Sequence, residues 1–230
     1  MAGSPALTLE TTAAISAEIV RVARLLRARR LAIGTSGNVS ARLDDGKIAI
    51  TPSTMDYDDL TAADVVIVSP DGSSSEGRRH PSSELPLHLA IFGARPDVRA
   101  IVHTHSPFAT TMAVARQEIP AVHYVLALLV RAGRDTIRVA RYATYGTEQL
   151  GENAVDALGE DHAVLLASHG AVAVGPSLAI ALERAERIEE LATLAWRAAA
   201  IGGATLLDVV ELDRVRVQMA RYPRQERVDD

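Results

Sequence analysis

The chain has 230 residues, of which 48% are hydrophobic and 23% charged, and it carries a formal net charge of −5 and no cysteine. This composition is typical of a folded soluble domain, and the lack of cysteine excludes disulfide frameworks and thiolate metal sites. There is no secretory signal and no run approaching about 18 apolar residues, so we expect a cytoplasmic protein with no membrane partner. The one dense basic cluster, at 27–30, has no interleaved aromatic residues, and we therefore expect no nucleic-acid partner.

In chain order, hydrophobic periodicity and turn residues predict a series of helices and strands. Helices are expected over 10–30, 83–96, 107–115, 123–133, 147–160, 177–202 and 208–221. Strands are expected over 47–53, 64–70, 98–106 and 136–142, with two more over 162–175 that bend at Gly170. The stretch 32–40 is predicted to be a turn because it is rich in Gly, Ser and Asn. Since helices and strands are interleaved, the class is α/β or α+β, with one central sheet and helices on its faces.

Three of the predicted helices follow a hydroxyl residue that can cap the first turn, namely Ser83, Thr147 and Ser177. No stretch has the composition of a linker between domains. We therefore expect a single domain over residues 1–230, with a mobile C-terminal tail from about residue 222 onward.

Two histidines one residue apart end the apolar run "AIVHTHS". In a strand, residues i and i+2 point to the same face, so His103 and His105 could share one metal ion. An isolated pair of this kind is more often two half-exposed side chains. A third histidine, His169, stands at another strand end, and a carboxylate, Glu84, stands at the start of a helix. Three imidazoles and one carboxylate suit a first-row divalent ion, and Zn²⁺ is favoured, with Mn²⁺ or Co²⁺ as alternatives.

Three loops rich in hydroxyl side chains form a second group, "GTSGNVS" at 34–40, "TPST" at 51–54 and "PSSE" at 81–84. Such loops can hold a phosphate through hydroxyl and backbone N–H groups, especially at a helix N-terminus. Each alone is more often an ordinary turn. Together with a candidate metal site, they indicate an anionic, sugar-like ligand.

Seven stretches, in this order and spacing, resemble the class II aldolase and adducin-like superfamily. They are "GTSGNVSARL", "ITPSTMDYDDL", "PSSELPLHLAIF", "AIVHTHSPFATTMA", "IPAVHYVLA", "RYATYGTEQL" and "LLASHG". The resemblance runs from about residue 10 to 222 and is closest to the fuculose-phosphate aldolases, with ribulose-phosphate epimerases as relatives. It implies a three-layer αβα sandwich, with a central, mainly antiparallel sheet flanked by helices.

The resemblance also implies roles for individual residues. The metal ligands would be His103, His105, His169 and Glu84, and Glu84 would become the catalytic base once substrate displaces it. The substrate phosphate would be held by Gly37, Asn38, Ser53, Thr54, Ser82 and Ser83. Tyr124 would protonate the aldehyde oxygen across a subunit boundary, and Tyr222 would close over the site. His88, one turn beyond Glu84, either orients that carboxylate or packs in the core.

The activity implied is zinc-dependent cleavage of a ketose 1-phosphate into dihydroxyacetone phosphate and a short aldehyde, through a metal-stabilised enediolate. The resemblance implies a homotetramer with active sites at subunit interfaces. Lys47, the single lysine, lies outside the motifs, which argues against a Schiff-base mechanism.

Several alternatives stay open. A sugar-phosphate epimerase or dehydratase of the same superfamily is one, although the epimerases carry aspartate where this chain has Glu84. A non-catalytic scaffold domain and a plain metal hydrolase are others. Two departures from the fuculose-phosphate pattern bear on the substrate: Thr54 replaces a glycine, and the segment 126–135 is bulkier and longer.

Overall fold

The computed structural model describes residues 5–221 of the chain, with side chains from residue 12 onward. The α-helices are α1 (Pro5–Ala28), α2 (Leu85–Ala94), α3 (Pro107–Ala115), α4 (Glu148–Leu158), α5 (Leu178–Ala200) and α6 (Val209–Ala220), and the 3₁₀ helices are η1 (Ala62–Asp64) and η2 (Tyr124–Leu128). The strands are β1 (Asn38–Arg42), β2 (Ile48–Ile50), β3 (Val66–Val68), β4 (Ser75–Glu76), β5 (Ala100–Thr104), β6 (Ile119–Pro120), β7 (Thr136–Ile137), β8 (Val139–Ala140), β9 (Ala163–Leu166) and β10 (Gly170–Gly175).

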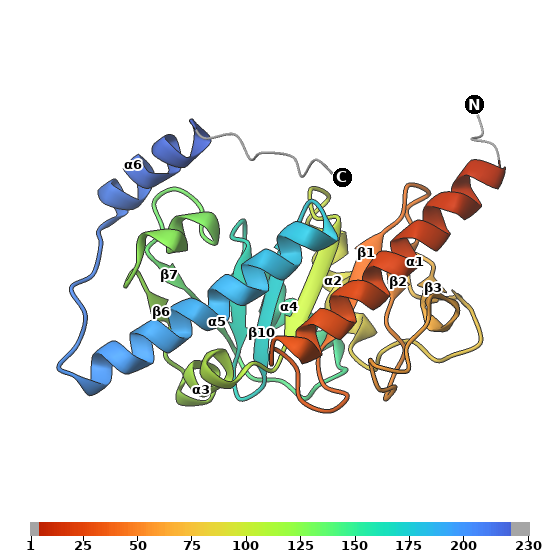
Figure 1. Ribbon diagram of the computed structural model, residues 1–230, viewed down its shortest axis with the longest axis horizontal. Helices are drawn as coiled ribbons and strands as arrows, with labels where there is room; N and C mark the ends of the chain where they lie inside the picture. The colour runs from red at the N-terminus through yellow and green to blue at the C-terminus, as the bar shows by residue number, and fades with distance from the viewer. Residues whose placement is uncertain (1–4, 222–230) are drawn as a thin grey trace.

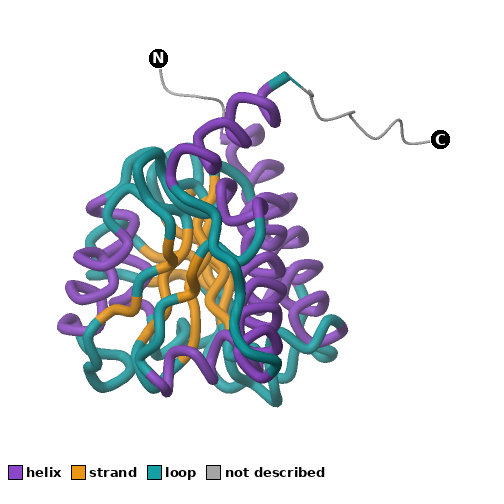
Figure 2. The backbone as a smooth tube through the Cα atoms, turned by 90° about the vertical axis from the view of Figure 1, so that its left-hand side faces the viewer, coloured by secondary structure: helices purple, strands orange, loops and turns teal. Residues whose placement is uncertain are grey.

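An eight-stranded sheet in the order β4-β3-β2-β1-β5-β10-β9-β8 forms the middle layer. Its neighbouring strands are antiparallel, except that β8 pairs parallel with β9. Helices α1, α3 and α5 pack on one face through one apolar cluster, and α2 and α4 pack on the other through a second. Figures 1 and 2 show the sheet between these two helical layers. The predicted three-layer fold with a mainly antiparallel sheet is therefore confirmed.

The alternation of side chains along β5 decides which layer the candidate ligands face. Val102 packs in the cluster with α1 and α5, whereas Ile101 packs in the cluster with α2 and α4. Because side chains alternate along a strand, His103 shares the face of Ile101. Its imidazole therefore points toward the layer that contains α2, and Glu84 is the residue immediately before that helix.

Several predicted elements match the structure closely. Helix α3 has the predicted bounds, and Thr147 and Ser177 cap α4 and α5 by accepting hydrogen bonds from Leu150 and Ile180 backbone N–H groups. Among the described residues, no helix has the length and apolar character that crossing a membrane requires.

Four local predictions are wrong. The predicted turn over 32–40 ends early, because Asn38 already begins β1 and pairs with β5. The cap of α2 is Glu84 rather than Ser83, and it forms no side-chain cap hydrogen bond. The single strand expected over 136–142 is two short strands: β7 pairs with β6 in a separate sheet, and β8 joins the main sheet. The predicted helix over 123–133 is only the short 3₁₀ helix η2.

Candidate metal centre and active-site pocket

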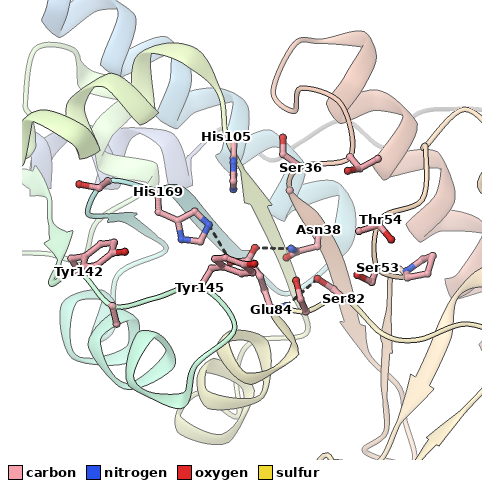
Figure 3. Close-up of a pocket in the computed structure, with 16 residues that line it drawn as sticks. Ser36, Asn38, Ser53, Thr54, Ser82, Glu84, His105, Tyr142, Tyr145 and His169 are labelled. Carbon is pink, nitrogen blue, oxygen red and sulfur yellow. Dashed lines mark hydrogen bonds and ion pairs between the residues drawn. The ribbon is translucent and has the colours of Figure 1, made fainter.

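Four side chains from three parts of the fold converge on one point. His103 lies on β5, His105 directly follows that strand, His169 lies in the turn between β9 and β10, and Glu84 caps α2. One nitrogen from each histidine and one carboxylate oxygen all lie within 4.8 Å of one another. Figure 3 shows His105, His169 and Glu84 facing the same space. The structure thus brings together all four residues that the sequence nominated as ligands.

Hydrogen bonding fixes which imidazole nitrogen of His103 faces the cluster. Its Nδ1 lies 2.9 Å from the carbonyl oxygen of Ala171, which can only accept, so Nδ1 carries the proton. Nε2 therefore points inward, 2.9 Å from Nε2 of His105 and 3.0 Å from Oε2 of Glu84. Ligand atoms around a tetrahedral zinc ion lie about 3.3 Å apart. The spacing and the inward-facing nitrogen both fit a bound divalent cation.

The charges around the cluster shift the pKa values of its members. Burial acts to lower the pKa of His103, but the charge of Glu84 and the hydrogen bonds with Glu84 and Ala171 outweigh it and raise that pKa. Burial disfavours ionisation of Glu84, but the charges of His103 and His169 and their hydrogen bonds outweigh it and lower its pKa. Burial and the neighbouring charges of His103 and His169 lower the pKa of His105 to about 3, so that imidazole is neutral. Oε1 of Glu84 is buried without a hydrogen-bond partner among the described residues and lies 3.1 Å from Nε2 of His169. A cation would satisfy that oxygen and the converging nitrogens together.

Asn38 connects the first hydroxyl-rich loop to this cluster. In the β1–β5 ladder it lies opposite His103, and its Nδ2 donates to Oε2 of Glu84 at 2.9 Å. One of its two amide hydrogens is therefore directed at the carboxylate. The sequence nominated Asn38 for phosphate binding and gave no sign of this contact.

A cavity of about 300 Å³ opens beside the cluster. It is lined by Thr35, Ser36, Gly37, Asn38, Pro52, Ser53, Thr54, Ser82, Ser83, Glu84, His105, Tyr142, Ala143, Tyr145, Ser168 and His169. All six residues nominated for phosphate binding are in this set. The hydroxyl loops form one side of the cavity and the metal cluster forms its floor (Figure 3). A volume of this size suits a small sugar phosphate.

Backbone conformation matters at two positions on the hydroxyl side. Gly37 has a φ of +76°, and a Cβ there would lie 2.8 Å from the carbonyl oxygen of His103. Only glycine therefore permits this close approach of the loop to β5. Thr54 has a φ of +53°, the left-handed region that disfavours a β-branched residue. This is the position at which the fuculose-phosphate pattern has glycine.

Tyr142 and Tyr145 form the outer wall of the cavity and were missed from the sequence. They come from the segment between β8 and α4 and are 58% and 66% exposed. Gly146, with a φ of +75°, lets this segment pass close to the carbonyl oxygen of Ser83. In the sequence, Gly146 directly after Tyr145 was the available signal of a tight turn. The close approach of Gly146 to Ser83 joins residues more than 60 positions apart, and no local pattern predicts it.

The structure places one of the two tyrosines nominated for catalysis, Tyr124, away from the cavity. Tyr124 begins η2, is 50% exposed and is not among the residues that line the cavity; its ring packs against His123. Tyr222 and the C-terminal tail lie outside the described residues.

Comparisons of the sequence and of the structure with known proteins all match class II aldolases. The family model described as Class II Aldolase and Adducin N-terminal domain matches residues 17–196. The chain is 40% identical over 204 residues to the 5-methylthioribulose-1-phosphate/5-deoxyribulose-1-phosphate aldolase of Rhodospirillum rubrum, covering 89% of this chain and 90% of that protein. It is 39% identical over 209 residues to the 5-deoxy-D-ribulose 1-phosphate aldolase of Bacillus thuringiensis, covering 90% and 96%. A solved L-fuculose 1-phosphate aldolase superposes with a TM-score of 0.85 at 34% identity, covering 90% and 96%.

Proposed function

The chain belongs to the class II aldolase family, whose curated relatives are aldolases and hence lyases, and we propose that it cleaves a ketose 1-phosphate into dihydroxyacetone phosphate and a short aldehyde. The convergence of three imidazoles and one carboxylate beside a cavity with a hydroxyl-lined side is the observation that carries this proposal. A scaffold domain has no need of such a cluster. A plain hydrolase has no need of the loops at 34–40, 51–54 and 81–84.

The four ligand residues would hold Zn²⁺, or Mn²⁺ or Co²⁺ in its place. When bound, such a cation supplies a Lewis acid for the negative charge that develops as the carbon–carbon bond breaks. Glu84 would move a proton at the carbon next to the carbonyl, and its Oε1, which has no hydrogen-bond partner among the described residues, supports this role. In the condensation direction Glu84 takes that proton, and in cleavage it returns it.

The phosphate end of the substrate would lie against Gly37, Ser53, Thr54, Ser82 and Ser83. The residues that line the cavity include no lysine or arginine, so hydroxyl and backbone N–H groups would carry the binding. Asn38 would serve both Glu84 and the substrate, one amide hydrogen for each.

The opposite end of the reaction requires a proton donor at the aldehyde oxygen, and the family resemblance assigns this role to Tyr124. Tyr124 is exposed and lies outside the cavity, which suits a side chain that reaches the site of a neighbouring subunit. We propose a cytoplasmic homotetramer in which Tyr124 of the partner subunit protonates the aldehyde oxygen and Tyr222 closes over the site. A monomer with full activity in solution would contradict this arrangement.

Among ketose 1-phosphates, we place 5-deoxypentulose phosphates first and L-fuculose 1-phosphate second. The two relatives named for 5-deoxyribulose 1-phosphate are about 40% identical over about nine tenths of this chain. The L-fuculose phosphate aldolase of Escherichia coli is 41% identical, but over 70% of this chain, and the solved fuculose enzyme is 34% identical over 90%. Both substrates share the phosphate and the reacting carbons and differ in the aldehyde that leaves.

The test measures bound metal and then cleavage of 5-deoxyribulose, 5-methylthioribulose and L-fuculose 1-phosphates, with release of dihydroxyacetone phosphate as the common readout. We expect chelated protein to stay folded without activity and to recover on addition of Zn²⁺. Epimerisation or dehydration of a pentulose phosphate that outruns cleavage would assign the chain to another reaction of the superfamily. Protein with no divalent metal and no cleavage in any assay would end the proposal.

A further inference from the structure

A chain of buried polar side chains lies behind Glu84, on the side away from the ligand histidines. Oγ of Ser40 lies 2.6 Å from Nδ1 of His88, Nε2 of His88 contacts Oδ1 of Asn38, and Nδ2 of Asn38 lies 2.9 Å from Oε2 of Glu84. Ser40 and His88 are completely buried, and Asn38 is 4% exposed. Polar groups this deep must be paired, and here each contact uses a different atom.

Only one assignment of protons satisfies all three hydrogen bonds that join Ser40, His88, Asn38 and Glu84. The Glu84 carboxylate accepts hydrogen bonds, so the amide nitrogen of Asn38 donates to it and the amide oxygen faces His88. That oxygen can only accept, so Nε2 of His88 carries the ring proton. Burial lowers the pKa of His88 to about 3, so the ring is neutral, Nδ1 is unprotonated, and the Ser40 hydroxyl donates to it. The direction of every bond follows from the carboxylate at its end.

The same reasoning shows what His88 does to Asn38. If the Asn38 amide were turned over, its oxygen would face the carboxylate and its NH₂ group would face an N–H of His88. The contact with the carboxylate would be repulsive, and the contact with His88 would be too unless the ring proton moved to Nδ1 and the Ser40 hydroxyl turned to accept it. His88, with its tautomer supported by Ser40, therefore helps to hold the amide with its donor toward Glu84. Ser40 and Asn38 lie on β1 and His88 lies on α2. Their hydrogen bonds therefore also connect the strand to the helix that Glu84 caps.

We propose that His88 is a positioning residue for Glu84, acting through Asn38. Held at Oε2 by the locked amide, the carboxylate keeps Oε1 free for a cation or for proton transfer. When Glu84 gives up its place beside a cation to serve as base, the Asn38 amide limits how far it swings. The inference rests on the proposed function, because it gives Glu84 both of those tasks.

Two substitutions of similar size separate positioning from packing. In His88→Gln, the side-chain amide ends near the place of Nε2 and can still donate to Asn38. In His88→Asn, the amide ends near the place of Nδ1 and can meet Ser40 but not Asn38. Both lose the ring, so both are expected to lower Tm by similar amounts. If His88 only packs, the two variants will have the same kcat and the same metal affinity.

We expect His88→Asn to lower kcat about tenfold or more and to weaken Co²⁺ binding about tenfold, as loss of a partner behind a metal ligand typically does. KM should change little, and His88→Gln should recover most of both losses. Co²⁺ affinity is read from its visible absorption and needs no substrate. Wild-type values of kcat and Co²⁺ affinity in folded His88→Asn would overturn the proposal.

A double-mutant cycle tests the route through Asn38. In an Asn38→Ala background, His88→Asn should cause no further loss of kcat or Co²⁺ affinity, since the link to Glu84 is already broken. Additive losses would mean that His88 acts some other way. Should His88→Asn fail to fold, Ser40→Ala removes only the hydroxyl that orients the ring, and we expect about a threefold effect in the same two readouts; no effect there overturns the proposal.

The two readouts also separate this inference from the proposed function. If no ketose phosphate is cleaved but Co²⁺ affinity follows the expected order, the positioning role stands and the assigned reaction falls. If the wild-type protein cleaves its substrate but His88→Asn and His88→Gln are indistinguishable, the reaction stands and the positioning role falls.

Discussion

The floor and the outer wall of one cavity are built in contrasting ways. On the floor, Glu84 is 6% exposed, and His103 beside it is fully buried; each has hydrogen bonds with neighbouring elements that leave one usable orientation. On the outer wall, Tyr142 and Tyr145 stand on a segment between elements, more than half exposed. The floor is fixed by strand register and by polar contacts behind it, whereas the wall is fixed by one loop.

The difference separates the reaction from its selectivity. Reacting groups must be held closely to the required geometry, and the floor provides this before any ligand arrives. Exposed aromatic side chains can change rotamer or identity at little cost to the core. We infer that the floor carries the chemistry of the proposed reaction and that the wall selects among substrates. The predictions below test that division, beginning with the floor.

The largest effect is expected from His103→Ala. Loss of one buried ligand, with its inward nitrogen 2.9 Å from that of His105, should reduce bound zinc to background. Activity should fall by about 10³-fold or more, since the Lewis acid is lost with the metal. Metal analysis and cleavage rates measure both, and His80→Ala is the matched control, because His80 is exposed and its side chain is outside the cavity. Full zinc content in His103→Ala would show that the cluster is not the metal site.

Glu84→Gln should come next, with a loss of about 10²–10⁴ in kcat, the usual effect of removing a general base. The fold should persist, because glutamine fills the same space and Asn38 can still donate to its oxygen. The exposed Glu76, paired with Lys47 at 2.8 Å, provides a control in Glu76→Gln, which should leave kcat unchanged. Wild-type turnover in Glu84→Gln would remove Glu84 from the role of base, whatever the metal content.

The same division governs what the sequence could reveal. His103 and Glu84 were predictable because a strand places i and i+2 on one face and because a helix start is readable from "PSSE". The hydrogen bond from Asn38 to Glu84 was not, since it depends on β1 pairing with β5, and β1 was expected to be part of a turn. Tyr145 was missed for a related reason: its place on the wall depends on a close approach to Ser83, which joins distant parts of the chain. Local periodicity predicts the elements and leaves such pairings open.

A moderate effect on the pH dependence of stability is expected from replacing His88, one of the buried polar side chains behind Glu84. Burial lowers the pKa of His88 to about 3 from an ordinary value of 6.5. Between these values the unfolded state binds the extra proton, so His88 contributes stability that is complete above pH 6.5 and is lost as pH falls. Replacing His88 by asparagine should flatten the fall by up to about 1.4 kcal/mol per pH unit.

Urea unfolding at several pH values from 7 down to 4, in the presence of chelator, measures this slope without a contribution from metal release. His80→Asn is the matched control, because His80 is exposed and its side chain lies outside the cavity. An identical slope in His88→Asn and the wild type would show that His88 does not remain neutral in the fold.

On the wall, Tyr145→Ala should change substrate preference more than turnover. We expect the ratio of kcat/KM between L-fuculose and 5-deoxyribulose 1-phosphates to shift about tenfold, the low end of the range for one apolar contact, because the side chain is exposed. Zinc content and the pH profile should match the wild type. A loss as large as that of Glu84→Gln for every substrate would place Tyr145 in the chemistry and erase the distinction between wall and floor.

The smallest effect is expected from Thr54→Gly, which sets two opposing terms against each other. A threonine at a φ of +53° is strained, by about 1–2 kcal/mol for a left-handed residue, and glycine relieves that strain. Glycine also gives the unfolded chain more freedom, which costs about 0.4–1 kcal/mol. We therefore expect unchanged or slightly higher stability, together with a severalfold change in KM for the phosphorylated substrate, because the loop lines the cavity.

Ser53→Gly has only the entropic cost, since Ser53 is not in the left-handed region, and it should be the less stable of the two variants. If Thr54→Gly is instead destabilised by as much as Ser53→Gly, the threonine side chain contributes contacts that offset its strain, and the hydroxyl side of the cavity is as firmly built as the floor.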